Sequence, residues 1–578
     1  MSSRSVRVLI TAMAGAACLA LSQAPSAAPS AVPDPGLGPN VTVFDPGMPR
    51  AVIQRKVDEV FRQQERNQFG PARHALLFKP GTYDVDVNVG FSTQVAGLGM
   101  SPDDVTIRGA VHAEAGWLQG NATQNFWREA ENLSVTPASG ADRWAVSQAA
   151  PYRRMHLRGD LRLDDGGWAS GGFLADSRID GQVRSGTQQQ WLSRDSRFGG
   201  WTGGTWNMVF VGVRNAPAGT FPRPPYTRVD RTPRVREKPF LYVDRAGAYR
   251  VFVPALRTAT SGTTWERGAR QPGSSRPLDR FLVVRPGTPA GRIQAALTRG
   301  KDLLLTPGVH HLDRTLRITR PGTVVLGLGL ATLVPDRGAT ALSVADVDGV
   351  RIAGLLVDAG PVASPALMEI GPPGARRRHE SDPVSLHDVF FRIGGAGVGK
   401  AVRTLVVNSS DVIGDDLWLW RADHGTGVGW RANTAAEGLV VNGDRVTMYG
   451  LFVEHYQRRQ TVWNGEDGRT YFFQNELPYD PPSQAAWRHG TAKGYPAYEV
   501  GGRVARHEGW GMGSYGHFTA DPRVVADRAF AAPRRPGVRF HDLVTVSLGG
   551  TGTIRHIVND TGGPSDATTN VAYLRSYP

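Results

Sequence analysis

A leucine-rich segment with an internal Pro-Gly turn occurs twice in the chain, as Leu76-Leu77-Phe78-Lys79-Pro80-Gly81-Thr82-Tyr83 and as Leu303-Leu304-Leu305-Thr306-Pro307-Gly308-Val309-His310. Each copy is followed, at nearly the same spacing, by a second shared motif, Val95-Ala96-Gly97-Leu98-Gly99 and Val325-Leu326-Gly327-Leu328-Gly329. A repeat that keeps both order and spacing indicates one architecture used twice in tandem.

Each copy is preceded by a short helical pattern. We expect these helices over 51–64 and 292–298, and both contain an Ile-Gln pair. A solenoid needs such a helix at its end, because the first coil would otherwise expose its apolar interior.

Downstream of each repeat the chain shows short apolar runs broken by Gly, Asp and Asn, as in 344–355. Closely spaced runs without a long helical period favour stacked strands. The sequence therefore predicts an all-β protein with two tandem right-handed parallel β-helices, over 40–257 and 281–560, and a cleft between them. Residues 258–280 are rich in Thr, Ser, Gly, Arg and Pro and are predicted to be a linker.

The N-terminus has the pattern of an export signal. Arg4 and Arg7 precede an apolar run that is too short for a membrane span, and small residues follow it. We predict a signal peptide over 1–31, an extracellular protein and no membrane association after processing. The one cysteine, Cys18, lies inside this segment, so the stability of the mature chain must come from a large core rather than from disulfides.

The formal net charge is +14. It is compatible with an affinity for anionic polymers, but a solvated Arg-rich surface is the favoured explanation. The sequence shows no basic stripe with interleaved aromatic residues, which would indicate nucleic-acid binding. We expect a monomer.

Two glutamates, Glu454 and Glu476, are separated by about one coil of a parallel β-helix. Residues one coil apart stack at the inter-strand distance of ~4.8 Å. Two carboxyl groups at that distance cannot both ionise freely, so one proton is held at a raised pKa. A proton-bearing carboxyl beside a sugar-sized cleft is the main requirement for glycoside hydrolysis.

Four motifs, together with the tandem architecture, resemble glycoside hydrolase family 55. The motifs span 391–396, 418–424, 453–455 and 474–479. The resemblance implies a polysaccharide partner, because it implies an exo-acting β-1,3-glucanase that hydrolyses laminarin-type glucan to glucose with inversion. It implies neither a metal nor another cofactor.

The resemblance also implies roles for individual residues. Glu476 matches the general acid, and Glu454 matches the glutamate that assists it. Gln148 and Ser170 match polar groups that hold the attacking water. Gln189 and Gln190 match a sugar-contacting or ladder position. Carboxyls stacked at ~5 Å would suit a retaining enzyme; since the family inverts, Glu454 is expected to tune Glu476, and the base is not identified by the sequence.

Sugar rings pack on aromatic faces, so we expect at least one of three tryptophans to line a subsite. The alternative for each is a place in the core. Asp423 and His424 are expected to hydrogen-bond the terminal glucose, although a pair that only satisfies a loop has the same pattern. The substrate-binding candidates from this part of the chain are Trp418, Trp420, Asp423, His424, Trp463 and Tyr479.

Two alternatives stay open at this point. Asp415 and Asp416 resemble the aspartate pair of polygalacturonase-like β-helices, although a companion Arg-Ile-Lys motif is missing. A non-catalytic carbohydrate-binding surface protein would also have this fold, and the Glu454–Glu476 pair is the feature against it.

Overall fold

The computed structural model describes Met1 and residues 36–266 and 271–578. The predicted signal peptide, apart from Met1, lies outside the described residues. Within the described part, no helix combines the length and the apolarity that a membrane crossing requires.

The first β-helix begins with helix α1 (Arg50–Gln64), whose apolar residues Ile53, Val57 and Val60 are buried against the first coils. Its first sheet consists of parallel strands in the order β1 (Val41–Phe44), β2 (His74–Phe78), β5 (Thr93–Gly97), β7 (Arg128–Glu131), β10 (Tyr152–Arg153), β13 (Gly172–Ala175), β15 (Gln190–Arg194), β17 (Asn207–Val211) and β18 (Tyr226–Val229). The second sheet has the order β3 (Gly81–Tyr83), β6 (Val105–His112), β8 (Ser134–Pro137), β11 (His156–Leu157), β14 (Arg178–Arg184), β12 (Asp160–Arg162) and β9 (Ala141–Arg143), and β4 (Asp86–Asn88) and β16 (Arg197–Thr202) pair at its sides.

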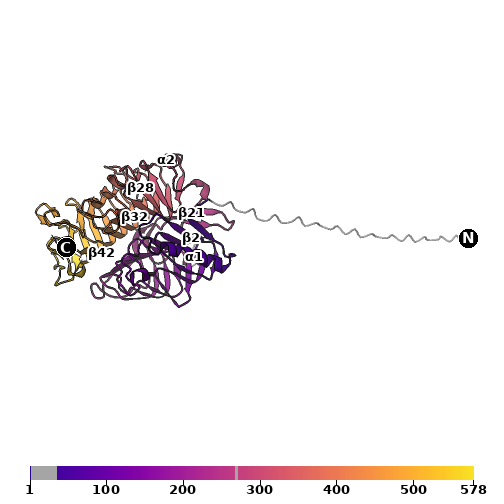
Figure 1. The fold of residues 1–578 in the computed structure, drawn as a ribbon, viewed down its shortest axis with the longest axis horizontal. Helices are drawn as coiled ribbons and strands as arrows, with labels where there is room; N and C mark the ends of the chain where they lie inside the picture. Colours follow the sequence, from indigo (N-terminus) through magenta and orange to yellow (C-terminus); the bar gives the residue numbers. More distant parts are fainter. Residues whose placement is uncertain (2–35, 267–270) are drawn as a thin grey trace. The chain divides into compact units, whose positions relative to one another are not determined.

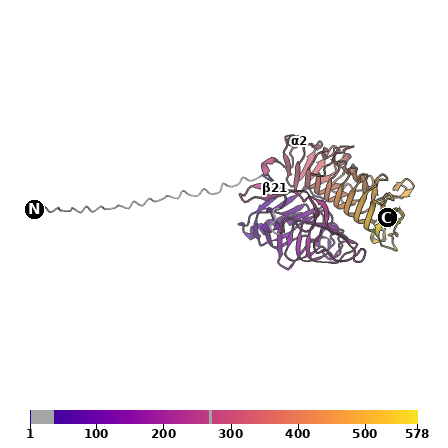
Figure 2. The same cartoon turned by 180° about the vertical axis from the view of Figure 1, so that it is seen from behind.

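The second β-helix begins with helix α2 (Ala290–Thr298) and extends towards the C-terminus (Figures 1 and 2). Its long sheet has the order β24 (Phe281–Val284), β25 (Asp302–Leu305), β28 (Val324–Pro335), β30 (Arg351–Asp358), β32 (Ser385–Ile393), β34 (Ile413–Arg421), β36 (Thr447–Glu454), β38 (Gly468–Gln474), β42 (His507–Gly516), β45 (Val538–Ser547) and β47 (Val571–Tyr577), and β26 (Val309–Leu312) pairs with β28. The other sheet has the order β27 (Leu316–Ile318), β29 (Leu342–Val344), β31 (Ser364–Ile370), β33 (Ala401–Val407), β35 (Ala435–Val441), β37 (Thr461–Trp463), β41 (Tyr498–Val500) and β44 (Phe530–Ala531).

The interior of the second β-helix is filled by side chains that stack from coil to coil. One such column follows the strand register through positions that are at most 1% exposed, namely Leu355, Val389, Leu417, Leu451, Phe473, Met512 and Leu543. Successive side chains of a strand point to opposite faces. Each strand of the long sheet therefore places one set of residues in this column and the other set on the face that meets the first β-helix.

The tandem β-helices and both capping helices confirm the prediction, but the boundaries differ. The segment predicted as a linker takes part in antiparallel sheets: β22 (Arg257–Thr260) pairs with β19 (Thr232–Val235), and β23 (Gly273–Pro277) pairs with β21 (Tyr249–Pro254), which also pairs with β20 (Phe240–Val243). The second β-helix also continues past residue 560, because β47 adds an antiparallel strand to β45. Loop-like composition does not exclude strands, because strand propensity depends strongly on the packing context.

The two β-helices are joined by a buried ionic cluster. Arg153 of the first contacts Asp388 and Asp415 of the second at 2.5 and 2.8 Å, and all three are at most 1% exposed. Arg194 contacts Asp415 at 2.8 Å. Removing one partner of such a buried pair would leave an uncompensated charge, which is strongly destabilising. The cluster therefore fixes the two β-helices against each other.

Candidate active site

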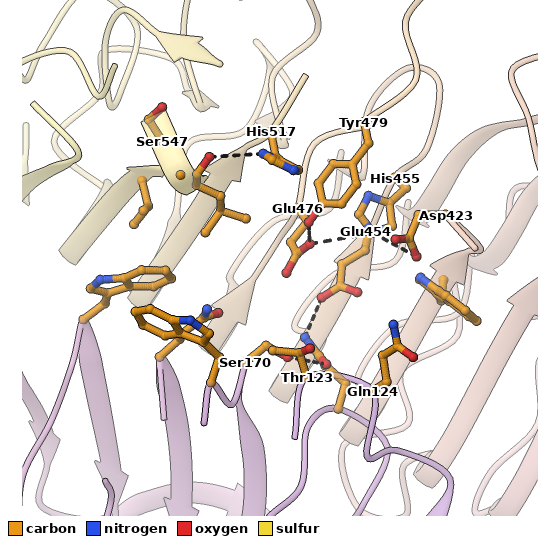
Figure 3. Close-up of a pocket in the computed structure, with 18 of the residues that line it drawn as sticks. Thr123, Gln124, Ser170, Asp423, Glu454, His455, Glu476, Tyr479, His517 and Ser547 are labelled. Atoms are coloured by element: carbon orange, nitrogen blue, oxygen red, sulfur yellow. Dashed lines mark hydrogen bonds and ion pairs between the residues drawn. The ribbon is translucent and has the colours of Figure 1, made fainter. Parts of the chain in front are cut away.

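A cavity of about 760 Å³ is lined by residues of both β-helices, so the predicted cleft lies between them. Figure 3 shows Thr123, Gln124 and Ser170 on one wall and Glu454, Glu476, Asp423 and Tyr479 on the other. The carboxyl groups that line the cavity are Asp423, Glu454 and Glu476.

The two glutamates lie on neighbouring coils, as their spacing predicts. Phe452 of β36 pairs with Gln474 of β38, and Glu454 and Glu476 each lie two residues further along. The backbone N–H of His455 donates to the carbonyl of Glu476 at 2.8 Å, which continues the register past the end of β38. Glu454 is 2% exposed, whereas the Glu476 side chain is 13% exposed. Glu476 is thus the more open of the two towards the cavity.

Burial raises the pKa of both carboxyl groups. For Glu454, burial is the main cause and the negative charge of Glu476 is the next, and the pKa lies well above its usual range. For Glu476, burial raises the pKa, while His455 and the Tyr479 hydroxyl partly oppose this effect. The two groups titrate as a coupled pair, so one proton is retained between them.

The two carboxyl groups differ in their hydrogen-bond donors. Glu454 accepts from Nε2 of Gln148 at 2.9 Å and from Nε1 of Trp418 at 2.8 Å, one donor on each oxygen. Glu476 accepts on Oε2 from the hydroxyl of Tyr479. Two N–H donors favour the ionised form of Glu454. These donors oppose the effect of burial on Glu454 without cancelling it, and the Tyr479 hydroxyl does the same for Glu476.

Polar groups of the first β-helix connect the cavity to Glu454. The Ser170 hydroxyl lies 3.1 Å from Oε1 of Gln148, whose amide nitrogen donates to Glu454. Ser170 and Gln148 both line the cavity. The residues predicted to act together, Glu476, Glu454, Gln148 and Ser170, are therefore brought to one place.

Tyr479 is held between two imidazole rings. Its ring centroid lies 4.4 Å from that of His455 and 4.9 Å from that of His517, both edge to face. Nδ1 of His517 faces the carbonyl of Leu548 at 3.1 Å, and His517 lines the cavity. His517 was not predicted from the sequence, because no motif surrounds it.

Asp423 and His424 also line the cavity. Nδ1 of His424 lies 3.0 Å from Oδ1 of Asp423. Although burial opposes the ionisation of Asp423, this hydrogen bond and the nearby imidazoles lower its pKa to about 2. Asp423 is therefore a permanent carboxylate that can accept hydrogen bonds from sugar hydroxyls.

The predicted tryptophans divide into two groups. Trp418 and Trp420 line the cavity but are only 1% exposed, because they stack on each other at 4.9 Å and on further aromatic rings. The prediction for Trp463 is wrong: it is fully buried in the core of the second β-helix. Apolarity alone does not tell which face of a strand a side chain occupies.

Two other tryptophans line the cavity and were not predicted. Trp168 is 61% exposed, and Trp206 is half-buried with its ring 4.7 Å from that of Tyr515. Trp168 lies two residues before Ser170 in a glycine-rich segment. Its closeness to this predicted site residue is the sequence feature that could have placed it at the cavity. These are the aromatic faces that are open to a ligand.

The two predicted glutamines also differ. Gln189 lines the cavity. Gln190 does not: its amide accepts from the hydroxyl of Tyr515 and lies within the interface between the β-helices. Its predicted contact with the sugar is therefore incorrect.

The polygalacturonase-like alternative is excluded by burial. Asp415 and Asp416 are 0% exposed, and Asp415 is bound by Arg153 and Arg194. Neither aspartate lines the cavity. In the described part of the chain, His, Cys, Asp and Glu side chains form no group of three that would hold a metal ion.

Comparison with known proteins identifies the family. Residues 281–476 match the family model described as the LAM55 pectate lyase-like domain. The chain is 56% identical to a protein named exo-beta-1,3-glucanase from Streptomyces sp. (strain SirexAA-E / ActE), over 96% of this chain and 92% of that protein.

Two solved structures are similar to this chain over nearly its whole length. The structure of sacteLam55A from Streptomyces sp. SirexAA-E has a TM-score of 0.92 and 57% identity, covering 94% of this chain and 99% of that chain. A variant of sacteLam55A in complex with glucose gives the same TM-score and identity, covering 94% of this chain and 98% of that chain. The chain described here is therefore a glycoside hydrolase and belongs to glycoside hydrolase family 55.

Proposed function

We propose that the protein is a secreted exo-acting β-1,3-glucanase that releases glucose from laminarin-type glucan with inversion, and that Glu476 is its general acid. The observation that carries the proposal is a carboxyl group with a raised pKa at the wall of a cleft, beside a second carboxylate that is already satisfied by two donors. The 56% identity to a protein named exo-beta-1,3-glucanase supports the substrate class.

In the proposed reaction Glu476 gives its proton to the oxygen of the departing glucan as the bond to the terminal glucose breaks. We place the proton on Glu476, because Glu454 accepts two N–H donors. General acid catalysis of this kind contributes typically ~10²–10⁴-fold to the rate. The Tyr479 hydroxyl donates to Oε2 of Glu476 and so leaves Oε1 to carry the proton.

Water attacks from the side of the first β-helix, where Ser170 and Gln148 hold it. Its proton passes to the Ser170 hydroxyl, the serine proton passes to Oε1 of Gln148, and the amide proton of Gln148 passes to Oε1 of Glu454. The supporting distances are 3.1 Å for Ser170 to Gln148 and 2.9 Å for Gln148 to Glu454. At the end of this transfer Gln148 is in its imidic-acid form, Glu454 is protonated and Glu476 is ionised. Return of Gln148 to the amide and of the proton from Glu454 to Glu476 completes the cycle. Glu454 then acts as the base through the relay, although it is stacked beside the acid.

The proposal is tested with purified protein on laminarin, pectin and other glucans. We expect glucose as the first product from laminarin and no release from pectin. Proton NMR of the initial product should show the α-anomer, since inversion converts the β-linkage. Initial β-glucose would contradict the mechanism, and oligosaccharides without glucose would contradict exo action.

The extracellular location rests on the N-terminal sequence pattern alone. Fractionation of expressing cells followed by N-terminal sequencing should find the enzyme outside the cell and without residues 1–31. Cytoplasmic protein that retains Met1 would overturn this part of the proposal.

A further inference from the structure

A loop of the first β-helix, residues 65–73 between α1 and β2, contacts the second β-helix beside the cavity. Its shape is held from both ends. The buried Gln64 donates from Nε2 to the carbonyls of Ala72 and Phe91, at 3.1 and 2.7 Å. Arg73, also buried, donates to the carbonyl of Gly70 at 2.7 Å. The loop therefore presents its central residues in a defined arrangement.

Phe69, near the centre of this loop, occupies a slot that two glycines leave open. A Cβ at Gly395 would lie 2.7 Å from the Phe69 ring, and one at Gly425 would lie 2.8 Å from it. Both glycines have positive φ, 87° and 99°, a region that other residues rarely adopt. The ring also stacks on Trp420, with centroids 6.2 Å apart and planes within 6°. This packing brings the preceding residue, Gln68, to His424.

The contact between Gln68 and His424 determines where the histidine carries its proton. Nε2 of Gln68 lies 2.6 Å from Nε2 of His424. An amide nitrogen only donates, so Nε2 of His424 must accept and carries no proton. The proton of the neutral ring is then on Nδ1, which lies 3.0 Å from Oδ1 of Asp423. The chain of donors runs from Gln68 through His424 to Asp423.

We infer that Gln68 is a positioning residue for the sugar-binding site: it holds His424 in the Nδ1-protonated form and thereby fixes Asp423 as an oriented hydrogen-bond acceptor in the cleft. This inference rests on the proposed function for the nature of the ligand, a terminal glucose unit. Gln68 does not itself line the cavity, whereas Asp423 and His424 do. Without Gln68 the imidazole is free to change tautomer or rotate, and Asp423 loses its donor.

The experiment measures binding rather than turnover. Glucose and a β-1,3-linked glucose trimer are titrated by calorimetry into the Glu476→Gln protein, which removes the transferable proton, with and without Gln68→Met. Methionine keeps the length of the side chain but has no N–H. The matched control is Gln63→Met, because Gln63 is exposed on the last turn of α1. Gln68→Ala is the second variant if methionine disturbs folding.

We expect Gln68→Met to weaken binding of both ligands roughly 3–10-fold, the range for losing one hydrogen bond in such a chain, and Gln63→Met to leave it unchanged. In a His424→Ala background the Gln68 substitution should have no further effect, because the group through which it acts is absent. A purely structural role would instead add to the effect of His424→Ala.

The outcomes separate the two proposals. Unchanged Kd values in the Gln68 variants, or additivity with His424→Ala, would overturn the positioning role. Failure of the wild-type protein to hydrolyse β-1,3-glucan would count against the proposed function, while a Gln68-dependent Kd for glucose would still support the positioning role. Absence of any binding heat from either ligand would overturn both.

Discussion

Gln148 of the first β-helix donates a hydrogen bond from Nε2 to Oε1 of Glu454 in the second, at 2.9 Å. This contact joins the wall that holds Ser170 to the carboxylate pair of the opposite wall. The proposed reaction needs both functions of the amide, since its oxygen faces Ser170 and its nitrogen faces Glu454.

Gln148→Leu should therefore lower kcat by roughly 10–100-fold, because Glu454 loses a donor while buried and the relay from Ser170 is interrupted. Steady-state kinetics on laminarin measure this. Gln182→Leu, at an exposed position of β14, is the matched control and should match the wild type. Equal activity of the Gln148 variant would show that the water is activated elsewhere.

Glu476→Gln should reduce hydrolysis of the polymer by ~10²–10⁴-fold and leave binding largely intact, because only the transferable proton is removed. An aryl glucoside with a good leaving group needs little protonation. If the cleft accepts it, the variant should lose far less activity on it than on the polymer. Glu508→Gln, a partly exposed glutamate of β42, is the control. Near wild-type activity of Glu476→Gln on laminarin would mean that the acid is another group.

Glu454→Gln should lower kcat, because it removes the group that receives the water's proton through the relay, and the alkaline limb of the remaining pH–rate profile should move towards acid. Activity requires the protonated form of Glu476 and is lost as the pH rises through its pKa. The negative charge of Glu476 raises the pKa of Glu454, and by the same Coulombic repulsion a charge on Glu454 disfavours ionisation of Glu476. Removing the charge of Glu454 therefore lowers the pKa of Glu476, and the acid ionises at lower pH. The measurement is kcat/KM against pH for wild type and variant; an unmoved limb would rule out this coupling.

Trp168→Ala should raise KM for laminarin by roughly 3–10-fold, with a smaller effect on kcat. The side chain lines the cavity and is 61% exposed, so it offers an open aromatic face, and such contacts are worth about 0.5–1.5 kcal/mol. Trp168→Phe keeps a flat apolar ring and should retain most of the affinity. An unchanged KM in the alanine variant would place the sugar away from this wall.

Asp416→Asn should stabilise the protein at neutral and alkaline pH. Both carboxyl oxygens of Asp416 are buried without a hydrogen-bond partner, and burial holds its pKa well above the usual range. A raised pKa in the folded state means that stability is highest below the unfolded-state pKa of ~3.9 and falls as pH rises towards the folded value.

Asparagine has the same shape without the charge and tolerates the positive φ of 65° at this position. In thermal unfolding we expect the variant to exceed the wild type by a few degrees in Tm at pH 8, and the difference to vanish near pH 4. Asp415→Asn is the contrasting neighbour: it removes the partner of Arg153 and Arg194 and should destabilise at both pH values. A constant difference for Asp416→Asn across this range would show that its ionisation has no part.

The repeat architecture was accessible from the sequence because its determinants are local. The Pro-Gly and Gly-Leu-Gly segments and the Ile-Gln helices recur in order, and a solenoid translates such order directly into stacked coils. The same locality explains Glu454 and Glu476: their separation equals one coil, and the pairing of Phe452 with Gln474 carries it into space.

The linker boundary and the end of the second β-helix were less accessible. Strands β22, β23 and β47 pair antiparallel with partners chosen by the fold, and their composition resembles that of loops. The sequence also did not decide which tryptophans lie in the core and which line the cleft. Trp463 is in the core, whereas Trp168 faces the cleft, because burial depends on which face of a coil a residue occupies and on what covers that face.

By itself the sequence determined the tandem β-helices, the two capping helices and the carboxyl pair, all of which depend on spacing within one coil or one repeat. Only the tertiary structure decided that Gln148 contacts Glu454 and that Gln68 contacts His424. It also decided that Asp415 forms a buried ion pair with Arg153. These partners are separated by more than 250 residues. Their contacts follow from how the two β-helices pack, which depends on the summed shape and charge of an entire interface rather than on any local pattern.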